Sequence, residues 1–438
     1  MDDSKHVIII GGGLAGCEAA WQLLKRGTRV SLYEMKPGNF SPAHKSEHLA
    51  ELVCSNSFRS NLRNSAVGLL KEEMRRLGSL VMKAADETSV PAGKALAVDR
   101  DLFSRHIENT LRSCTGLELI RTERTEIPEH ETVIIATGPL TSDSLAQSVS
   151  RLTGSDYLYF YDAISPIVDG ESIDYTKAFR ASRYDPGEGD YINCPMTEAE
   201  YELFWTELMG GTEVLMKDFE DKKYFEGCLP IEVLGRRGKK TLLFGPMKPV
   251  GLIDPGTGKQ PHAVVQLRQE NIHSTLFNIV GFQTKLTWPE QRRIFRLIPG
   301  LEQAEFVRYG SIHRNTFINS PALLAESLQL RSHNDIFFTG QIAGVEGYVE
   351  SAAMGLLSGI QIDRYLSGKD NIPPPETTAL GALLRHTTNT DYKTFQPMNI
   401  NFGLFPPLAK KRPKKHRGTY YAERALYDLE SWLQTISY

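Results

Sequence analysis

The first 34 residues constrain the fold of this chain more than any other stretch. An apolar run, Val7–Ile10, is followed by Gly11-Gly12-Gly13-Leu14-Ala15-Gly16 and then by helix-forming residues from Cys17 to Leu24. A second apolar run, Arg29–Tyr33, ends on Glu34, which lies 18 residues after Gly16. This order of strand, glycine turn, helix and acidic strand end is the dinucleotide-binding fingerprint of doubly wound α/β folds.

Each glycine of the fingerprint has a mechanical role. We expect Gly11 to make the tight turn, Gly13 to let the backbone approach a pyrophosphate, and Gly16 to let helix and strand pack closely. The helix N-terminus faces the phosphates, and Glu34 accepts hydrogen bonds from a ribose. The neighbouring residues Gly12, Leu14, Ala15 and Met35 are expected at the same cofactor. The fingerprint alone leaves FAD and NAD both open.

Two later strands return the chain to the predicted cofactor. Glu131–Pro139 is a buried run that ends on Ala-Thr-Gly, and Asp335–Gln341 is another that ends on a glycine. A helix rich in small residues is expected from Gly344 to Gly355. This return is typical of FAD domains and favours FAD over NAD. It adds four residues to the predicted cofactor site, of which the tyrosine has the ordinary alternative of a core residue: Gly138, Gly340, Gln341 and Tyr348.

The length and the order of the segments predict more than one domain. A chain of 438 residues suggests about two to three domains. Beyond residue 150, a dense aromatic run at 157–161 precedes short strand-like runs: Thr241–Phe244, Ala263–Leu267 and Phe277–Val280. We expect an α/β fold in which a Rossmann-like FAD-binding domain (1–150 and 331–438) is interrupted by a smaller mixed α/β insertion domain (151–330) that holds substrate. The last part ends in a basic segment.

Composition excludes several classes of protein. Hydrophobic residues make up 41% and charged residues 24% of the chain, which is ordinary for a globular protein. The absence of an apolar run of membrane-spanning length and of a signal peptide predicts a cytoplasmic protein without a membrane partner. The net charge of −3 excludes a polycation, so any nucleic-acid binding must come from local patches.

The five cysteines point to single reactive thiols, because they include no Cys-x-x-Cys pair. This argues against a disulfide scaffold and against a metal site. Cys54 lies in a polar stretch with Arg59 close behind, and positive charge favours the reactive thiolate. Cys228 lies between a glycine and Leu-Pro, a rigid setting for a nucleophile. For both, the ordinary alternative is a buried packing residue, which is the role we assign to Cys17, Cys114 and Cys194.

Two cationic segments suggest a polyanionic partner in this net-acidic chain. Solvated faces or a disordered tail are the alternatives. The segments contain the following cations: Arg236, Arg237, Lys239, Lys240, Lys410, Lys411, Arg412, Lys414 and Lys415.

A polar strand-and-turn stretch, residues 307–321, contains His313 and Arg314. His313 could stack on a flat ligand or carry a proton, or it could be a satisfied structural residue.

The segments in this order resemble one family, the folate- and FAD-dependent tRNA (uracil-5-)-methyltransferases. The resemblance covers nearly the whole chain and rests on these stretches: GGGLAGCEAA, AELVCSNSFRSN, SVPAGKALAVDR, ATGPLTS, DYLYFYDAISPIV, FEGCLPIEV, LFGPMKPVGL, VGFQTKL, RYGSIHRNTFINSP, GQIAGVEGYVESAAMGLLSG and FQPMNINFGL. It implies an enzyme that passes the one-carbon unit of 5,10-methylenetetrahydrofolate through FAD to C5 of the T-loop uridine of tRNA. The product is 5-methyluridine, and NADH or NADPH reduces the flavin.

The resemblance also implies roles for individual residues. Cys228 would be the nucleophile at uracil C6 and Cys54 the acceptor of the C5 proton, although the two roles could be exchanged. His313 and Arg314 would bind folate, Tyr348 would lie by the flavin, and the cationic segments would contact tRNA. Two alternatives stay open: an NAD(P)H-dependent flavoprotein oxidoreductase acting on a small molecule, and a non-catalytic tRNA-binding flavoprotein. Monomer and homodimer are both compatible with the sequence.

Overall fold

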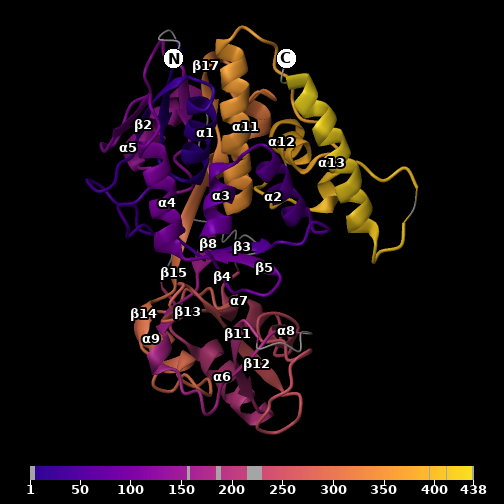
Figure 1. Ribbon diagram of the computed structural model, residues 1–438. Helices are drawn as coiled ribbons and strands as arrows, with labels where there is room; N and C mark the ends of the chain where they lie inside the picture. Colours follow the sequence, from indigo (N-terminus) through magenta and orange to yellow (C-terminus); the bar gives the residue numbers. More distant parts are fainter. Residues whose placement is uncertain are drawn as a thin grey trace.

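A parallel sheet forms the centre of the larger part of the molecule (Figure 1). The computed structural model describes residues 5–154, 158–183, 189–214, 229–393, 395–410 and 412–436. The strand order of this sheet is β16-β17-β7-β1-β2-β6, and only the edge strand β16 is antiparallel to its neighbour. The strands are β1 (His6–Ile10), β2 (Arg29–Tyr33), β6 (Leu117–Ile120), β7 (Val133–Ile135), β16 (Gln329–Leu330) and β17 (His333–Phe338). The prediction of an α/β fold with a parallel sheet is confirmed.

Two helices of small residues pack against each other over this sheet: α1 (Leu14–Leu24) and α11 (Tyr348–Leu366). A Cβ on Gly355 would lie 2.2 Å from the carbonyl oxygen of Ala15, so only glycine permits this approach. The helix begins later than the predicted Gly344. Gly344 and Gly347 have φ of +83° and +109°, which are not helical values, and a 3-10 turn occupies residues 340–343.

Further helices surround the parallel sheet and carry a small three-stranded sheet of order β3-β5-β4. Asp99 caps the N-terminus of α4, because its carboxylate accepts hydrogen bonds from the amides of Asp101 and Leu102, both at 3.1 Å. The elements are β3 (Ser57–Ser60), β4 (Ser89–Val90), β5 (Ala95–Val98), α2 (Ala66–Arg76), α3 (Leu80–Glu87), α4 (Arg100–Arg112), α5 (Asp143–Thr153), α10 (Ser320–Leu323), α12 (Ala379–Asn389) and α13 (Arg417–Ile436).

A second six-stranded sheet, of order β10-β11-β12-β13-β9-β14, forms the lower part in Figure 1 around its own apolar core. Its elements are β9 (Ile167–Asp169), β10 (Phe179–Ala181), β11 (Tyr191–Met196), β12 (Ala263–Gln269), β13 (Leu276–Ile279), β14 (Phe306–Arg308), α6 (Glu198–Gly210), α7 (Ile231–Arg236), α8 (Thr241–Phe244) and α9 (Trp288–Phe295). The strand expected at Thr241–Phe244 was wrong. Leu242 is buried but Phe244 is 82% exposed, as suits one helical turn with a single side chain on the core.

A two-stranded ribbon of β8 (Leu158–Ile164) and β15 (Ser311–Phe317) runs between the two parts (Figure 1). The parts are also joined directly, since the Asn56 side chain donates a hydrogen bond to the backbone oxygen of Gln269 at 2.9 Å. The chain between Cys54 and Ser57 therefore lies at the junction. No helix of the described residues has the length and apolar character of a membrane span.

Candidate functional site

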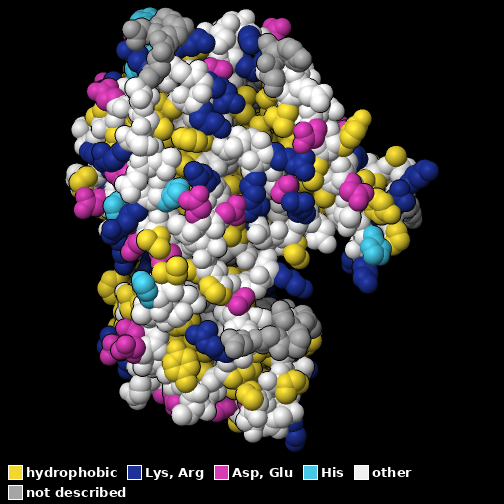
Figure 2. Space-filling view, viewed as in Figure 1, with side chains coloured by type: hydrophobic (Ala, Val, Ile, Leu, Met, Phe, Trp, Pro, Cys, Tyr) yellow, Lys and Arg dark blue, Asp and Glu magenta, His cyan; other side chains and the backbone are white. Residues whose placement is uncertain are grey.

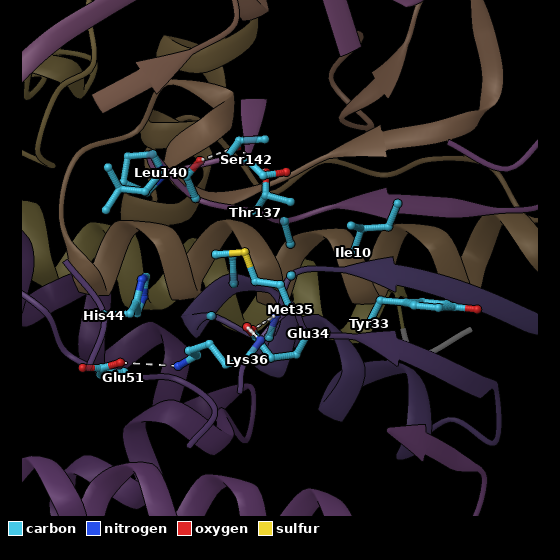
Figure 3. A pocket seen from close by; sticks show the side chains of 18 of the residues that line it. Ile10, Tyr33, Glu34, Met35, Lys36, His44, Glu51, Thr137, Leu140 and Ser142 are labelled. Carbon is cyan, nitrogen blue, oxygen red and sulfur yellow. Dashed lines mark hydrogen bonds and ion pairs between the residues drawn. The ribbon is translucent and has the colours of Figure 1, made fainter. Parts of the chain in front are cut away.

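A cavity of about 1040 Å³ lies over the glycine turn, and we call it the glycine-loop cavity. The strand ends of β1, β2 and β7 surround it, as expected at the carboxyl edge of a parallel sheet. Figure 3 shows the Met35 side chain in its middle, Tyr33 toward one end, and His44 and Glu51 toward the other. Of the predicted cofactor residues, the following line it: Gly11, Gly12, Gly13, Leu14, Ala15, Glu34, Met35, Gly138, Gln341 and Tyr348.

The glycines differ in what surrounds them. A Cβ on Gly16 would lie 1.9 Å from the Gly11 oxygen, and one on Gly340 would lie 2.6 Å from the Ala15 Cβ, so both sit in close packing beside the cavity. Gly11 has φ of +109°. A Cβ on Gly13 would meet no described atom within 4 Å, which leaves open space in front of the α1 N-terminus. That is where the amides of an uncapped helix can receive an anion.

The Glu34 carboxylate is held in place by the backbone. Its Oε2 accepts a hydrogen bond from the Gly12 amide at 2.9 Å, and its Oε1 accepts one from the Lys36 amide at 3.0 Å. The Lys36 ammonium instead turns to Glu51, 3.4 Å away (Figure 3). A carboxylate oxygen has more than one acceptor site, so Glu34 keeps capacity for a ligand hydroxyl.

A second cavity, of about 1340 Å³, adjoins the first, and we call it the cysteine cavity. Both cavities are lined by Val53, Pro139, Leu140, Gln341 and Tyr348. Cys54 and His313 line the cysteine cavity together with residues of the second sheet, including Arg268 and Asn278. The junction of the two parts thus brings Cys54, His313 and Tyr348, far apart in sequence, around one space.

Cys54 is hydrogen-bonded to Tyr348, the first residue of α11. The sulfur lies 2.9 Å from the tyrosine oxygen, and the amides of Cys54 and Ser55 donate hydrogen bonds to the same oxygen at 2.8 and 3.2 Å. Burial, and then the nearby Cys54 sulfur, raise the pKa of Tyr348 well above its ordinary value. Tyr348 therefore stays a neutral phenol at physiological pH.

His313 is neutral at physiological pH. Burial and the neighbouring Arg308 guanidinium lower its pKa to about 4. Its Nε2 lies 2.8 Å from the Ser311 hydroxyl, which orients the ring. A neutral imidazole on the cavity wall can stack on a flat ligand. The backbone of Arg314 follows in β15, paired with Tyr161.

The second predicted reactive thiol, Cys228, lies outside the described residues. The chain that resumes at Leu229 is tied to the cysteine cavity, because the Ile231 amide donates a hydrogen bond of 2.7 Å to the oxygen of Gln283, a residue of the cavity wall. Cys17 and Cys194 are buried, and burial raises the pKa of both thiols, that of Cys194 to about 12. Such thiols are poor nucleophiles at neutral pH.

The two cationic segments have different surroundings. Arg236 and Lys239 form ion pairs with Glu213 and Glu202, respectively. These carboxylates partly neutralise the positive charge that the two side chains would present to an anionic partner. Lys240 directly precedes α8, and Arg237 follows α7. Lys410, Arg412, Lys414 and Lys415 belong to the loop that precedes α13 and projects from the body; Lys411 lies outside the described residues. Figure 2 shows Lys and Arg side chains on this projection, across a hollow from the second part.

Sequence reasoning missed a set of arginines around Cys54. Arg268 is 7% exposed and donates hydrogen bonds to the Ser55 hydroxyl at 2.8 Å and to the Asn56 side chain at 3.0 Å. Arg100 pairs with Glu270 at 2.6 Å. The available signal was an arginine inside the apolar strand Ala263–Gln269, because a buried charge requires partners.

Comparisons with known proteins cover most or all of the chain. The family model described as "Glucose inhibited division protein A" matches residues 6–370. A protein of Syntrophus aciditrophicus named "Methylenetetrahydrofolate--tRNA-(uracil-5-)-methyltransferase TrmFO" is 66% identical over 100% of this chain and 99% of its own. One of Geobacter sp. (strain M21) with the same name is 58% identical over 99% and 100%. Among solved structures, GidA of Aquifex aeolicus has a TM-score of 0.71 at 16% identity, covering 100% of this chain and 74% of that one; it supports the fold.

Proposed function

The chain belongs to the family of the methylenetetrahydrofolate–tRNA-(uracil-5-)-methyltransferases, and from this premise we propose that it methylates C5 of the T-loop uridine of tRNA. The carbon comes from 5,10-methylenetetrahydrofolate, FAD is the bound cofactor, and NADH or NADPH is the reductant. The observation that carries the proposal is the pair of adjoining cavities, which share Tyr348 and Gln341 while Cys54 and His313 line only the second. We further propose that the enzyme works in the cytoplasm.

The open space at Gly13 and the polar groups that line the glycine-loop cavity are compatible with FAD. Open space at Gly13 accepts a pyrophosphate in front of the α1 amides, and Glu34 accepts a ribose hydroxyl. The shared wall at Tyr348 would then face the isoalloxazine. When bound, the flavin supplies the redox chemistry that turns a transferred methylene into a methyl group.

The cysteine cavity has room for the pterin and the target uracil. Neutral His313 would stack on the pterin, with Arg314 as a second folate residue. The uridine must leave the stacked T-loop to reach this space. We assign residues 151–330 as a substrate domain inserted between two parts of an FAD domain, 1–150 and 331–438; the antiparallel second sheet with its own core supports an insertion. Its end lies before residue 330, because β16 (Gln329–Leu330) pairs in the parallel sheet.

Two thiols would do the acid–base and covalent work at uracil. The Cys228 sulfur bonds to C6, which makes C5 a carbon nucleophile that takes the one-carbon unit. Cys54 removes the C5 proton, and release of Cys228 restores the C5–C6 double bond. Reduction of the methylene to methyl consumes a hydride that originates from the nicotinamide. The role of Cys228 is supported by the described residue Ile231, three positions further on, whose amide donates a hydrogen bond to the Gln283 oxygen of the cavity wall.

The cations of residues 236–240 and 410–415 would bind tRNA phosphates. The projecting loop is favoured for this role, because Arg236 and Lys239 already have carboxylate partners.

The test is mass spectrometry of tRNA nucleosides after incubation with methylenetetrahydrofolate labelled at its methylene carbon. We expect labelled 5-methyluridine with a nicotinamide reductant, and neither Cys228→Ala nor Cys54→Ala to form it while both keep bound flavin. Methylation that requires S-adenosylmethionine, or reductase activity without any labelled nucleoside, would reject the proposal. Tight tRNA binding with no labelled nucleoside would indicate a non-catalytic binding protein instead.

A further inference from the structure

The polar neighbours of the Tyr348 hydroxyl determine to which atom it donates its hydrogen bond. A phenolic oxygen has one proton to donate and two lone pairs that accept. The amides of Cys54 and Ser55 both donate to this oxygen, at 2.8 and 3.2 Å, and so engage both lone pairs. The remaining polar neighbour among the described residues is the Cys54 sulfur, at 2.9 Å.

Only one arrangement satisfies all three contacts. If the thiol donated its proton to Tyr348, the phenolic oxygen would receive three hydrogen bonds and its own proton would have no acceptor. If Tyr348 donates to the sulfur, its proton and both of its lone pairs have partners, and the sulfur is a stronger acceptor as a thiolate. We propose that Tyr348 is a positioning residue whose hydroxyl keeps its proton and donates a hydrogen bond to the Cys54 sulfur, and thereby holds Cys54 as a thiolate ready to accept the uracil C5 proton. This inference rests on the proposed function.

The charges around the cysteine favour the same state. Three guanidinium groups on three elements have a Coulombic interaction with Cys54: Arg100 of α4, Arg268 of β12 and Arg308 of β14. The carboxylate of Glu270 acts on Arg100 and Arg268, and that of Glu51 acts on Arg308. The surplus of positive charge stabilises a thiolate, as at known reactive cysteines.

Three further titratable groups face this cluster. His313 interacts electrostatically with Arg308 and is neutral at physiological pH. Tyr191 interacts electrostatically with Arg268. Arg59 lines the same cavity and forms an ion pair with Glu350 of α11. The cluster therefore keeps its positive surplus at neutral pH.

The hydroxyl also fixes where the thiolate points. Because the two amides and the sulfur belong to adjacent residues, one phenol anchors both the backbone and the side chain of this turn to the first turn of α11. Tyr348 lines both cavities, so the anchor holds Cys54 at their border. A phenylalanine would keep the ring between the cavities and remove the proton donor.

The pH dependence of alkylation at Cys54 tests the proposal without any methyl transfer. The flavin-bound protein is exposed to iodoacetamide across a pH series and digested with trypsin, and modification is measured on the peptide of residues 46–59, in which Cys54 is the single cysteine. In the unmodified protein we expect a midpoint below about 8.5, the value of a free cysteine. In Tyr348→Phe the midpoint should rise by about one unit or more, with roughly tenfold slower alkylation at pH 7.

Tyr201→Phe is the matched control, because Tyr201 belongs to the core of the second part, donates to the Lys239 backbone oxygen and does not line the cysteine cavity. It should leave the Cys54 profile unchanged. Identical alkylation profiles in Tyr348→Phe and the unmodified protein would overturn the proposal. A midpoint at or above about 8.5 in the unmodified protein would also overturn it, and this measurement does not depend on whether Tyr348→Phe folds. Failure of labelled 5-methyluridine to form, with the expected alkylation shifts, would reject the methyltransferase function and leave the hydrogen bond established.

Discussion

Replacing Gly13 by alanine should weaken binding of the cofactor and leave the fold intact. In the protein without flavin, the new methyl group meets no described atom within 4 Å, and the backbone at Gly13, with φ of −79° and ψ of −170°, suits any residue. The loss of an N-cap glycine costs a few tenths of a kcal/mol to about 1, and the reduced entropy of the unfolded chain offsets about 0.4–1 kcal/mol. The free energy of unfolding of the flavin-free protein should therefore change by less than about 1 kcal/mol.

The cost appears when the pyrophosphate binds. The methyl group projects into the space through which the phosphates approach the α1 amides, and overpacking of this kind costs about 1–3 kcal/mol. The Kd for FAD should rise by about 5- to 150-fold. The assay is the return of free-FAD fluorescence on dilution, with urea unfolding of the flavin-free protein in parallel. Gly210→Ala is the matched control, because a Cβ there also meets no described atom within 4 Å, at the end of α6 in the second part. Unchanged FAD affinity in Gly13→Ala would refute the reasoning, and so would an equal loss in the control.

Three further predictions follow from packing, burial and charge. Gly355→Ala places a methyl group 2.2 Å from the Ala15 oxygen, so the flavin-free protein should lose about 2 kcal/mol or more of unfolding free energy; an unchanged urea midpoint would contradict the close approach of α1 and α11. Burial lowers the pKa of Lys71 to about 7, so folding releases a proton between pH 7 and about 10.4, and the stability of the unmodified protein relative to Lys71→Met should rise from pH 7 to pH 9. A flat or falling difference in urea midpoints would show that Lys71 stays charged. Changing Lys410, Arg412, Lys414 and Lys415 to glutamine should weaken tRNA binding and lower its salt slope by about 0.7–0.9 for each phosphate that the loop no longer neutralises, while an unchanged slope would leave the loop as a solvated segment.

Local patterns predicted those elements whose residues interact with near neighbours. The glycine turn requires a strand before it and a helix after it, and β1, α1 and β2 are where the spacing put them. Asp99 caps α4 through amides two and three residues away, so the sequence contained the whole interaction. The errors came where the pattern was short or the backbone unusual: the four apolar residues of α8 and the left-handed glycines before α11.

Helix α13 was missed for a different reason. Its buried residues Tyr421, Ala425, Leu429 and Trp432 follow a helical spacing. The basic run before them led us to interpret the end of the chain as a tail.

The sequence by itself determined the parallel nucleotide-type sheet and identified Cys54, His313 and Tyr348 as residues with possible chemistry, because glycine spacing and residue type are local properties. The tertiary structure alone decided that these three line one cavity, that Tyr348 touches the Cys54 sulfur, and that Arg100, Arg268 and Arg308 surround it. The physical reason is distance along the chain: 294 residues separate Cys54 from Tyr348, and only the packing of α4, α11 and the second sheet around the turn after Val53 brings a phenol and three guanidinium groups to one sulfur.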